Sequence, residues 1–261
     1  MKKFLLILLK TLAVAAFWIG VWCLVAYRTG NDFLFPSLPR VWQELLRLVR
    51  SVDFWLIMGT SLLRVLWGIL VSLIVGVALA ILTSTSKILC ALLSPALSAI
   101  KSTPVASFII LALLWMDRDM LPVFITALIV IPIVWANISE GIRRVDNNLV
   151  EVATLYRFSP TKKATRLYIP SVAPYFMAAC RSALGMAWKA GIAAEILATP
   201  KSAIGTELYY SKTYLETPTL FAWTLVVILL SLVIERLLVW ALLRTASRFK
   251  ILPKGDTHAE R

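Results

Sequence analysis

Residues 56–83 read LIMGTSLLRVLWGILVSLIVGVALAILT and contain a single charged side chain, Arg64. About 20 apolar residues are enough to cross the hydrocarbon core of a bilayer as an α-helix. Lipid offers no hydrogen-bonding partner to backbone N–H and C=O groups, so a run of this kind has to satisfy them within a helix. The stretch therefore predicts a transmembrane helix and an integral membrane protein.

The rest of the chain repeats this pattern. Of the 261 residues, 60% are hydrophobic and 16% are charged, whereas a soluble domain is nearer half apolar and a quarter charged. One run is interrupted by Arg181, Lys189 and Glu195, although it exceeds a span in length. The predicted fold class is all-α, a polytopic membrane protein of about six transmembrane helices. The five further runs are residues 4–27, 88–115, 121–138, 172–197 and 220–231.

The basic residues predict the orientation. The net charge is +13, but most of the surplus lies in short segments between or beyond the spans. One side of the predicted topology carries twice as many Lys and Arg residues as the other. The positive-inside rule then predicts that both termini are cytoplasmic. Because this bias explains the charge, nucleic acid is not an expected partner.

The chain divides into three predicted parts. Residues 1–55 hold the first transmembrane helix and an outer segment, residues 56–245 form the transmembrane permease core, and residues 246–261 form a basic cytoplasmic tail. Within the first part, residues 39–53 place their apolar side chains on one helical face. This pattern favours an amphipathic helix in the outer interface, and an ordinary connecting helix in solvent remains the alternative.

Metal binding and catalysis have little support in the sequence. The three cysteines are isolated inside apolar runs, and the single histidine, His258, lies in the polar tail. This spacing predicts no metal site and no disulfide framework. The chain has no G-x-x-x-x-G-K-[ST] motif, so we expect it to hydrolyse no ATP. We predict a chain that is not an enzyme and binds no cofactor.

The longest predicted inner loop is residues 141–170, GIRRVDNNLVEVATLYRFSPTKKATRLYIP. Asn148 followed by Glu151 resembles a capping box and predicts a helix start. The Ser159-Pro160 pair predicts a second start, with Ser as the N-cap and Pro in the first turn. We expect Pro170 to end that second helix. The loop therefore predicts two short helices that project into the cytoplasm.

A helical hairpin of this kind has two interpretations. One is a structured loop that carries positive-inside charge, and the other is a docking element for a soluble partner. In the second interpretation the small side chain of Ala153 permits close approach, while neighbouring apolar and acidic groups fit a cleft on the partner.

Several segments resemble one family in order along the chain. Glu151-Val152-Ala153 and Ile169-Pro170 resemble the EAA loop of the permease subunits of binding-protein-dependent ABC importers. The nitrate, sulfonate and taurine subgroup is the most similar. Further resemblances are FPSLP at 35–39, SLLRVLWG at 61–68, KSTPVA at 101–106, AWKA at 187–190 and AEIL at 194–197.

The resemblance implies a fold like that of type I ABC importer permeases and a place in the bacterial cytoplasmic (inner) membrane. It implies a translocation pathway for a small solute, such as nitrate, a sulfonate or taurine. The partners would be an ABC ATPase subunit dimer that binds ATP and Mg²⁺, a second permease subunit (identical or different), an extracytoplasmic solute-binding protein and the lipid bilayer. The implied ATPase-coupling residues are Glu151, Val152, Ala153, Arg157, Ser159, Pro160, Ile169 and Pro170.

Arg157 departs from the family pattern, which usually has Gly at this position. Glycine suits a left-handed helix end, and arginine tolerates that conformation poorly. We therefore expect a different turn here, or a helix that continues to Phe158.

Charged side chains inside the spans suggest a pathway. Each costs about 2.5–3.5 kcal/mol on insertion scales, so a retained one usually has a use. A pathway lined by Lys101 and Lys189 would suit an anion. The alternative is that Arg64 snorkels to an interface and that Lys189 pairs with a carboxylate of another helix. The candidate pathway residues are Lys101, Ser102, Thr103, Pro104, Lys189 and Glu195.

An ion-coupled secondary transporter is the alternative function. It requires a carboxylate at membrane depth as an ion site, and Glu195 is the plausible one. This alternative does not explain the helical hairpin of residues 141–170.

Overall fold

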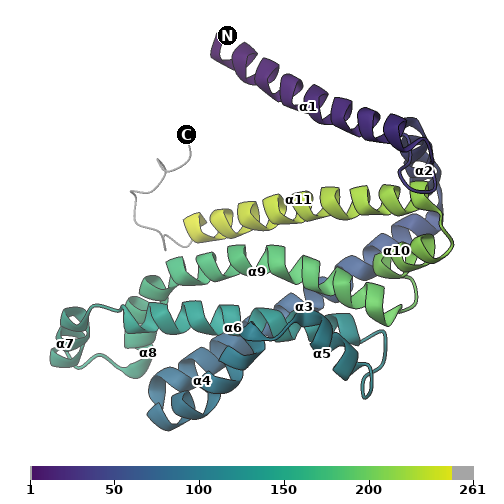
Figure 1. Ribbon diagram of the computed structural model, residues 1–261. Coiled ribbons are helices and arrows are strands. Elements are labelled where there is room, and N and C mark those ends of the chain that lie inside the picture. The colour runs from purple at the N-terminus through teal and green to yellow at the C-terminus, as the bar shows by residue number, and fades with distance from the viewer. Residues whose placement is uncertain (1, 249–261) are drawn as a thin grey trace.

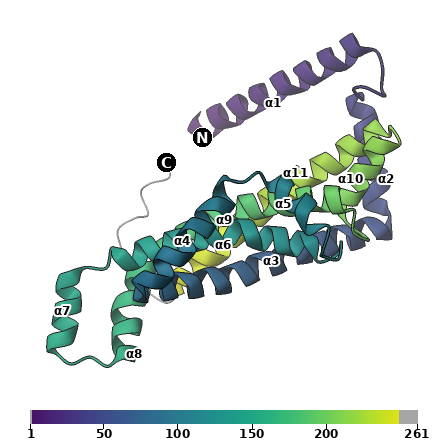
Figure 2. The same ribbon diagram turned by 60° about the horizontal axis from the view of Figure 1, so that its bottom comes forward.

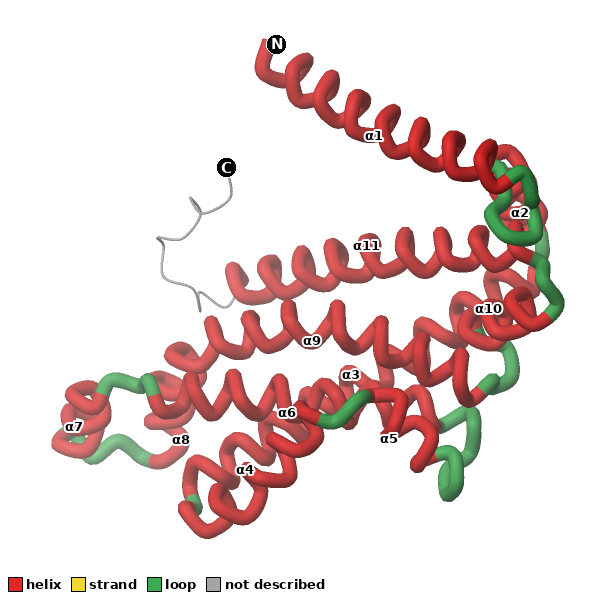
Figure 3. The backbone as a smooth tube through the Cα atoms, in the orientation of Figure 1, coloured by secondary structure: helices red, strands yellow, loops and turns green. Residues whose placement is uncertain are grey.

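The chain forms helices along its whole described length, residues 2–248 of a computed structural model (Figure 1). The described residues contain no β-strand, and short loops join the helices (Figure 3). The predicted all-α class is confirmed. Most of the predicted basic tail, 246–261, lies outside the described residues. The helices are α1 (Lys2–Thr29), α2 (Leu38–Arg50), α3 (Val52–Thr85), α4 (Lys87–Ser102), α5 (Val105–Ala112), α6 (Leu121–Arg143), α7 (Asn147–Leu155), α8 (Pro160–Lys163), a π-helical turn (Ala164–Tyr168), α9 (Ile169–Ala198), α10 (Ile204–Thr213) and α11 (Thr217–Arg248).

The core of the molecule lies where α6 packs between α3 and α9. Val65, Val134 and Ala187 are buried there, one from each helix. A Cβ atom added to Gly68 of α3 would lie 2.6 Å from the Cβ of Thr126 in α6. Glycine therefore lets the two backbones approach closely, which is a common device of helix pairs in membranes.

The described helices bear out four or five of the six predicted spans. Four helical segments are long and apolar enough to cross a membrane: 9–29, 52–85, 121–143 and 217–237. The pair α4 and α5 makes a fifth if it is one broken span. The sixth predicted run, α9, has 30 residues. It also carries Arg181, Lys189 and Glu195, and it lies alongside α6 and α11 (Figure 1).

The third predicted run, 88–115, is not one straight helix. It breaks at Thr103 and Pro104, and α4 and α5 are bent by 103° at this point. Pro104 has no N–H to donate, and its ring disfavours a helical conformation of the preceding residue. Thr103 accordingly has extended dihedral angles, φ −84° and ψ 135°. The break brings four predicted pathway residues, 101–104, to a bend.

The first helix stands apart from the others (Figure 1), and its apolar window has no buried residue. Its outer end is attached near the start of α11. There Trp22 donates from Nε1 to the carbonyl of Pro36 at 3.1 Å, and its ring lies 5.3 Å from that of Phe221.

A helix is present where one was predicted over 39–53, but it is α2, which ends at Arg50; it packs against α3 and α11 and buries Val41. Because α3 begins at Val52, the predicted division at 55/56 falls inside its first turn. Figure 2 shows α7 and α8 at one end of the molecule, with α2 and α10 at the opposite end.

Candidate functional site

The hairpin formed by α7 and α8 begins two residues before the predicted start. The N-cap of α7 is Asp146, whose Oδ1 accepts a hydrogen bond from the backbone N–H of Asn148 at 2.9 Å. The predicted capping box of Asn148 and Glu151 is therefore wrong, since Glu151 lies in the middle of the helix and is exposed. An aspartate at 146 offers the same cap chemistry two residues earlier, so it competes with the asparagine.

The end of α7 is a Schellman motif built around Arg157. The N–H of Phe158 donates to the carbonyl of Ala153, and the N–H of Arg157 donates to that of Thr154, both at 2.9 Å. Arg157 has φ +53°. Both alternatives that we predicted are wrong, because arginine adopts the left-handed conformation usual for glycine and the helix ends at Leu155. The two hydrogen bonds and the packing of Phe158 compensate for the strain.

A small apolar cluster holds the hairpin together. Ala153 is 4% exposed and packs with Val145 and Leu167. Phe158 covers the same cluster. Lys163 of α8 donates from Nζ to the Oγ1 of Thr154 in α7 at 3.0 Å. Ala153 therefore permits close approach within the hairpin, and its predicted contact with a partner is not available in this conformation.

The second helix of the hairpin begins as predicted. The Oγ of Ser159 accepts from the N–H of Lys162 at 3.3 Å, and Pro160 occupies the first turn. Pro170, however, does not end this helix. The π turn Ala164–Tyr168 joins α8 to α9, so Ile169 and Pro170 lie in the first turn of α9. Since the first turn of a helix has free N–H groups, proline is tolerated there.

The outer face of α7 has no partner among residues 2–248. Leu155 and Tyr156 are 81% and 72% exposed. Leu149 and Val152 are about half exposed, and the carboxylate of Glu151 is exposed beside them. Among the hydrogen bonds and ion pairs of the described residues, none engages that carboxylate. An apolar face with a free carboxylate can dock into a groove that offers apolar surface and a basic group.

A second polar site lies inside the core, where Glu195 of α9 is fully buried. Its Oε2 accepts from the Oγ of Ser61 at 2.9 Å and from the N–H of Gly205 at 3.1 Å. The same Ser61 hydroxyl accepts from the N–H of Ile204 at 2.9 Å. A Cβ added to Gly205 would lie 2.3 Å from the Cβ of Glu195. The carboxylate therefore joins α3, α9 and the start of α10.

Arg64 extends this cluster toward the loops. Its Nη1 lies 3.7 Å from Oε1 of Glu195, and its Nη2 lies 2.8 Å from Oδ1 of Asp119. Nη2 also donates to the carbonyl of Lys201 at 2.8 Å. The guanidinium is thus bound inside the chain, and the prediction that it snorkels to an interface is wrong. Its isolated charge was visible in the sequence, whereas its distant partners were not.

The two predicted pathway lysines lie apart from this cluster. Lys101 is exposed, and its Nζ lies 5.9 Å from the centroid of the Trp135 ring. Lys189 is exposed on α9, while Glu195, six residues further, faces the interior. Ser102 and Thr103 donate from their hydroxyls to the carbonyl of Ala99 at 3.0 and 2.8 Å. Pro104 is exposed at the same bend.

No set of three or more His, Cys, Asp or Glu side chains among residues 2–248 is arranged to hold a metal ion. The arrangement combines a helical hairpin at one end with a broken helix, α4 and α5. The family model for the inner membrane component of binding-protein-dependent transport systems matches residues 52–246. The chain belongs to this family. This membership makes it a transport component, and it agrees with the resemblance read from the EAA-like loop.

Several known permease proteins are similar in sequence to this chain. The bicarbonate transport system permease protein CmpB of Synechocystis is 31% identical over 169 residues, which cover 62% of this chain and 59% of that protein. A probable ABC transporter permease protein of Haemophilus influenzae is 24% identical, over 91% of this chain and 96% of that protein. A putative aliphatic sulfonates transport permease protein, SsuC of Bacillus subtilis, is 24% identical, over 82% of this chain and 78% of that protein. The chain thus spans less than two thirds of the CmpB protein.

Two solved structures have the same fold. A chain of the MetNI methionine ABC transporter, in an inward-facing conformation, has a TM-score of 0.52 at 16% identity and covers 83% of this chain and 100% of its own. A chain of a bacterial alginate ABC transporter, solved with an alginate-bound periplasmic protein, has a TM-score of 0.61 at 13% identity, covering 95% and 96%. The predicted permease fold of ABC importers is confirmed.

Proposed function

We propose that the chain is the permease subunit of an ATP-driven importer of the bacterial inner membrane, and that it passes a small oxyanion or sulfonate. The proposal rests on membership of the inner membrane component family and on the bicarbonate and sulfonate systems named among its relatives. The observation that carries it is the hairpin of α7 and α8, whose apolar face has no partner within the described chain.

The hairpin would receive the ATPase subunits. Leu155, Tyr156 and Val152 offer apolar surface, and Glu151 offers a carboxylate to a basic group of the partner. ATP and Mg²⁺ would bind to those subunits, and two copies would meet two permease subunits. Closure of the ATPase dimer would then move the hairpins and alternate the access of the pathway.

The pathway would use the bend between α4 and α5 and the exposed lysine of α9. Broken helices often form substrate sites in transporters, because a break exposes backbone groups to a cavity. Lys101 lies at the bend, and Lys189 is exposed on α9, where it would face the pathway. Both cations would attract an anion. Glu195 is bonded within the chain, so we do not assign it to the pathway.

The same bonds speak against an ion-coupled secondary transporter. The Oε2 of Glu195 accepts two hydrogen bonds, and its Oε1, which has no hydrogen-bond partner among the described residues, lies 3.7 Å from Nη1 of Arg64. The guanidinium balances the charge of the carboxylate, so a transported cation would have to compete with it. The hairpin also has no role in that mechanism.

Docking is tested by placing a charge on the apolar face of α7. Leu155→Asp, with the cognate ATPase subunits co-expressed, should abolish their co-purification, because an aspartate would be buried in the groove without a partner. The control is Leu215→Asp, which changes another exposed leucine, 63% exposed against 81% for Leu155, at the opposite end of the molecule. Co-purification by the Leu155→Asp variant at the level of the control would contradict the proposal.

The pathway is tested in proteoliposomes that hold the whole transporter. Lys101→Ala and Lys189→Ala should each reduce uptake while the substrate-loaded binding protein still stimulates ATP hydrolysis. Arg118→Ala, a change of an exposed cation in a loop, serves as the control. If uptake and stimulated ATP hydrolysis are unchanged in both lysine variants, the anion pathway is refuted.

A further inference from the structure

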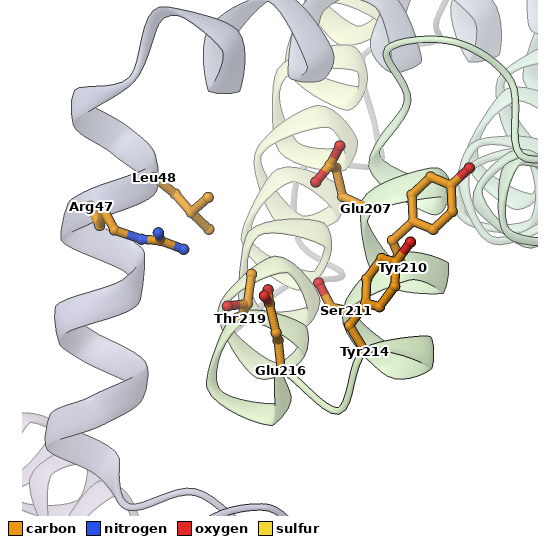
Figure 4. Close-up of a pocket in the computed structure, with 8 residues that line it drawn as sticks. All are labelled: Arg47, Leu48, Glu207, Tyr210, Ser211, Tyr214, Glu216 and Thr219. Carbon is orange, nitrogen blue, oxygen red and sulfur yellow. The ribbon is translucent and has the colours of Figure 1, made fainter.

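A pocket of about 340 Å³ lies between α2, α10 and the first turn of α11, at the end of the molecule opposite the hairpin (Figures 2 and 4). Helices from distant parts of the sequence form it, since α11 packs against both α2 and α10. None of the predicted site residues lies in it. Its lining residues are Arg47, Leu48, Glu207, Tyr210, Ser211, Tyr214, Glu216 and Thr219.

Two residues of the pocket wall, Ser211 and Thr219, are buried, and their hydroxyls have no hydrogen-bond partner among the described residues. Ser211 is 4% exposed and Thr219 is 8% exposed. Neither hydroxyl makes a hydrogen bond with any part of the chain that the structure describes. Because neither oxygen is among the fully enclosed polar atoms that lack a partner, both are open to the pocket. Both lie on the pocket wall (Figure 4), so they can accept hydrogen bonds from a group that enters it.

The residues that line the pocket carry two carboxylates and one guanidinium, so negative charge is in excess there. Glu207 and Glu216 both line it, and burial together with the charges of Glu216 and Asp53 raises the pKa of Glu207. The cation that lines the pocket, Arg47, is already paired with another carboxylate, because its Nε lies 2.7 Å from Oε2 of Glu44. A second positive group would therefore relieve the repulsion between the carboxylates.

Tyrosine rings form the rim. Tyr210 and Tyr214 stack with their centroids 6.0 Å apart and are 44% and 69% exposed. Exposed tyrosines are typical of protein interfaces, where they supply both contact area and a polar tip. Their ring faces also attract a cation.

We propose that this pocket receives a lysine or arginine side chain of the external binding protein when that protein docks on the permease. The inference rests on the proposed function, because it needs a binding protein and an outward-facing position for this end of the chain. Two carboxylates and two hydroxyls accept hydrogen bonds from the ammonium or guanidinium group, and the tyrosines cover its aliphatic stem. A small free amine has the same head group but could not use the exposed tyrosine rim as a contact surface.

The test uses the whole transporter in lipid nanodiscs and the cognate binding protein loaded with substrate. The variant is Glu207→Gln/Glu216→Gln, which removes both charges while keeping the shape of the side chains. We expect its Kd for the binding protein to rise about tenfold or more, which corresponds to about 1.4 kcal/mol, and to depend less on salt because fewer charges are screened. Asp117→Asn, a change of a carboxylate in the loop between α5 and α6, should leave the Kd unchanged.

Two readouts separate this inference from the proposed function. Basal ATP hydrolysis and co-purification with the ATPase subunits should be normal in the double variant. If the wild-type chain itself neither co-purifies with ATPase subunits nor supports ATP hydrolysis, the proposed function fails, whatever the pocket binds. A photo-crosslinking residue placed at Tyr214 should label the binding protein beside a lysine or arginine.

Three results would overturn the inference. The first is an unchanged Kd in the double variant, and the second is a crosslink far from any basic residue of the binding protein. The third is saturable calorimetric binding of n-butylammonium to the transporter alone that disappears in the double variant, since this would assign the pocket to a free amine.

Discussion

The molecule holds two carboxylates in opposite situations. Glu195 is fully buried and bonded to two helices, with a guanidinium beside it. Glu151 is exposed on the hairpin and bonded to nothing within the described chain. The buried charge has its partners inside the subunit, so it maintains the packing of α3, α9 and α10. The exposed charge leaves its hydrogen-bonding capacity for another protein.

This difference shows that a charged residue in a membrane protein is not by itself a transport residue. The cost of bringing Arg64 and Glu195 into the core is offset by their mutual contacts and by backbone groups of the loops. We therefore expect changes in the buried cluster to act on folding and changes on the hairpin to act on assembly.

The largest effect is expected for Arg64→Met, which leaves the charge of Glu195 without its counterion. Breaking a buried pair in this way costs about 3–5 kcal/mol. The purified variant should unfold at a much lower temperature, as followed by tryptophan fluorescence in detergent. The double variant Arg64→Met/Glu195→Gln removes both charges and should recover much of the loss. Equal instability of the single and double variants would refute the pairing, and Glu151→Gln should behave like the wild type.

A smaller effect is expected for Gly205→Ala, because the new Cβ would lie 2.3 Å from that of Glu195. Overpacking of this kind costs about 1–3 kcal/mol. Gly185→Ala on α9 is the control, since its Cβ would have no atom within 4 Å. A thermal unfolding series should separate the two variants. If the two variants unfold at the same temperature, α10 can move away from α9 at little cost and the close contact is not limiting.

Loss of the cap at Ser159 should have a moderate effect on the hairpin. Ser159→Ala removes the acceptor for the N–H of Lys162, and an N-cap of this type contributes about 1 kcal/mol. Hydrogen exchange should become faster in residues 160–168 and remain unchanged around Glu195. Ser159→Asp should restore the protection, because aspartate caps as well as serine does. No change in exchange would show that the π turn alone maintains this segment.

The smallest change is expected for Arg157→Gly, and its sign is opposite. Glycine adopts φ +53° without the strain that a side chain introduces. The hairpin should be stabilised by a few tenths of a kcal/mol up to about 1 kcal/mol, after allowance for the greater entropy of glycine in the unfolded chain. Slower hydrogen exchange in residues 147–158 would support this expectation. Faster exchange would mean that the arginine side chain makes contacts worth more than the strain.

The sequence predicted the spans because apolar runs of sufficient length have one solution in lipid. It did not predict the bend at Thr103 and Pro104, because the hydropathy of a run gives no information on whether the helix axis is straight. Arg64 was noticed as an isolated charge, yet its partners lie far along the chain. Ser61 and Glu195, for example, are 134 residues apart. Only the packing of α3 against α9 brings such groups together.

The hairpin was predicted more closely, because caps and turns depend on local residues. Ser159 and Pro160 were assigned correctly, whereas Asp146 was overlooked beside an equally suitable asparagine. Arg157 was misjudged because its strain was considered without the hydrogen bonds and the Phe158 contact that compensate for it. The outer pocket had no sequence signal, since its residues come from three separate helices.

The π turn between α8 and α9 has a mechanical consequence. It widens the helix for one turn, and the chain passes from α8 into α9 without a loop. Kinks in helices occur at π turns and at internal prolines, and this segment has both, with Pro174 inside α9. One end of the segment belongs to the hairpin, and Glu195 near the other end is bonded to α3 and α10. A displacement of the hairpin therefore reaches the core along continuous helical backbone, and bending at the π turn and at Pro174 sets how much of it arrives.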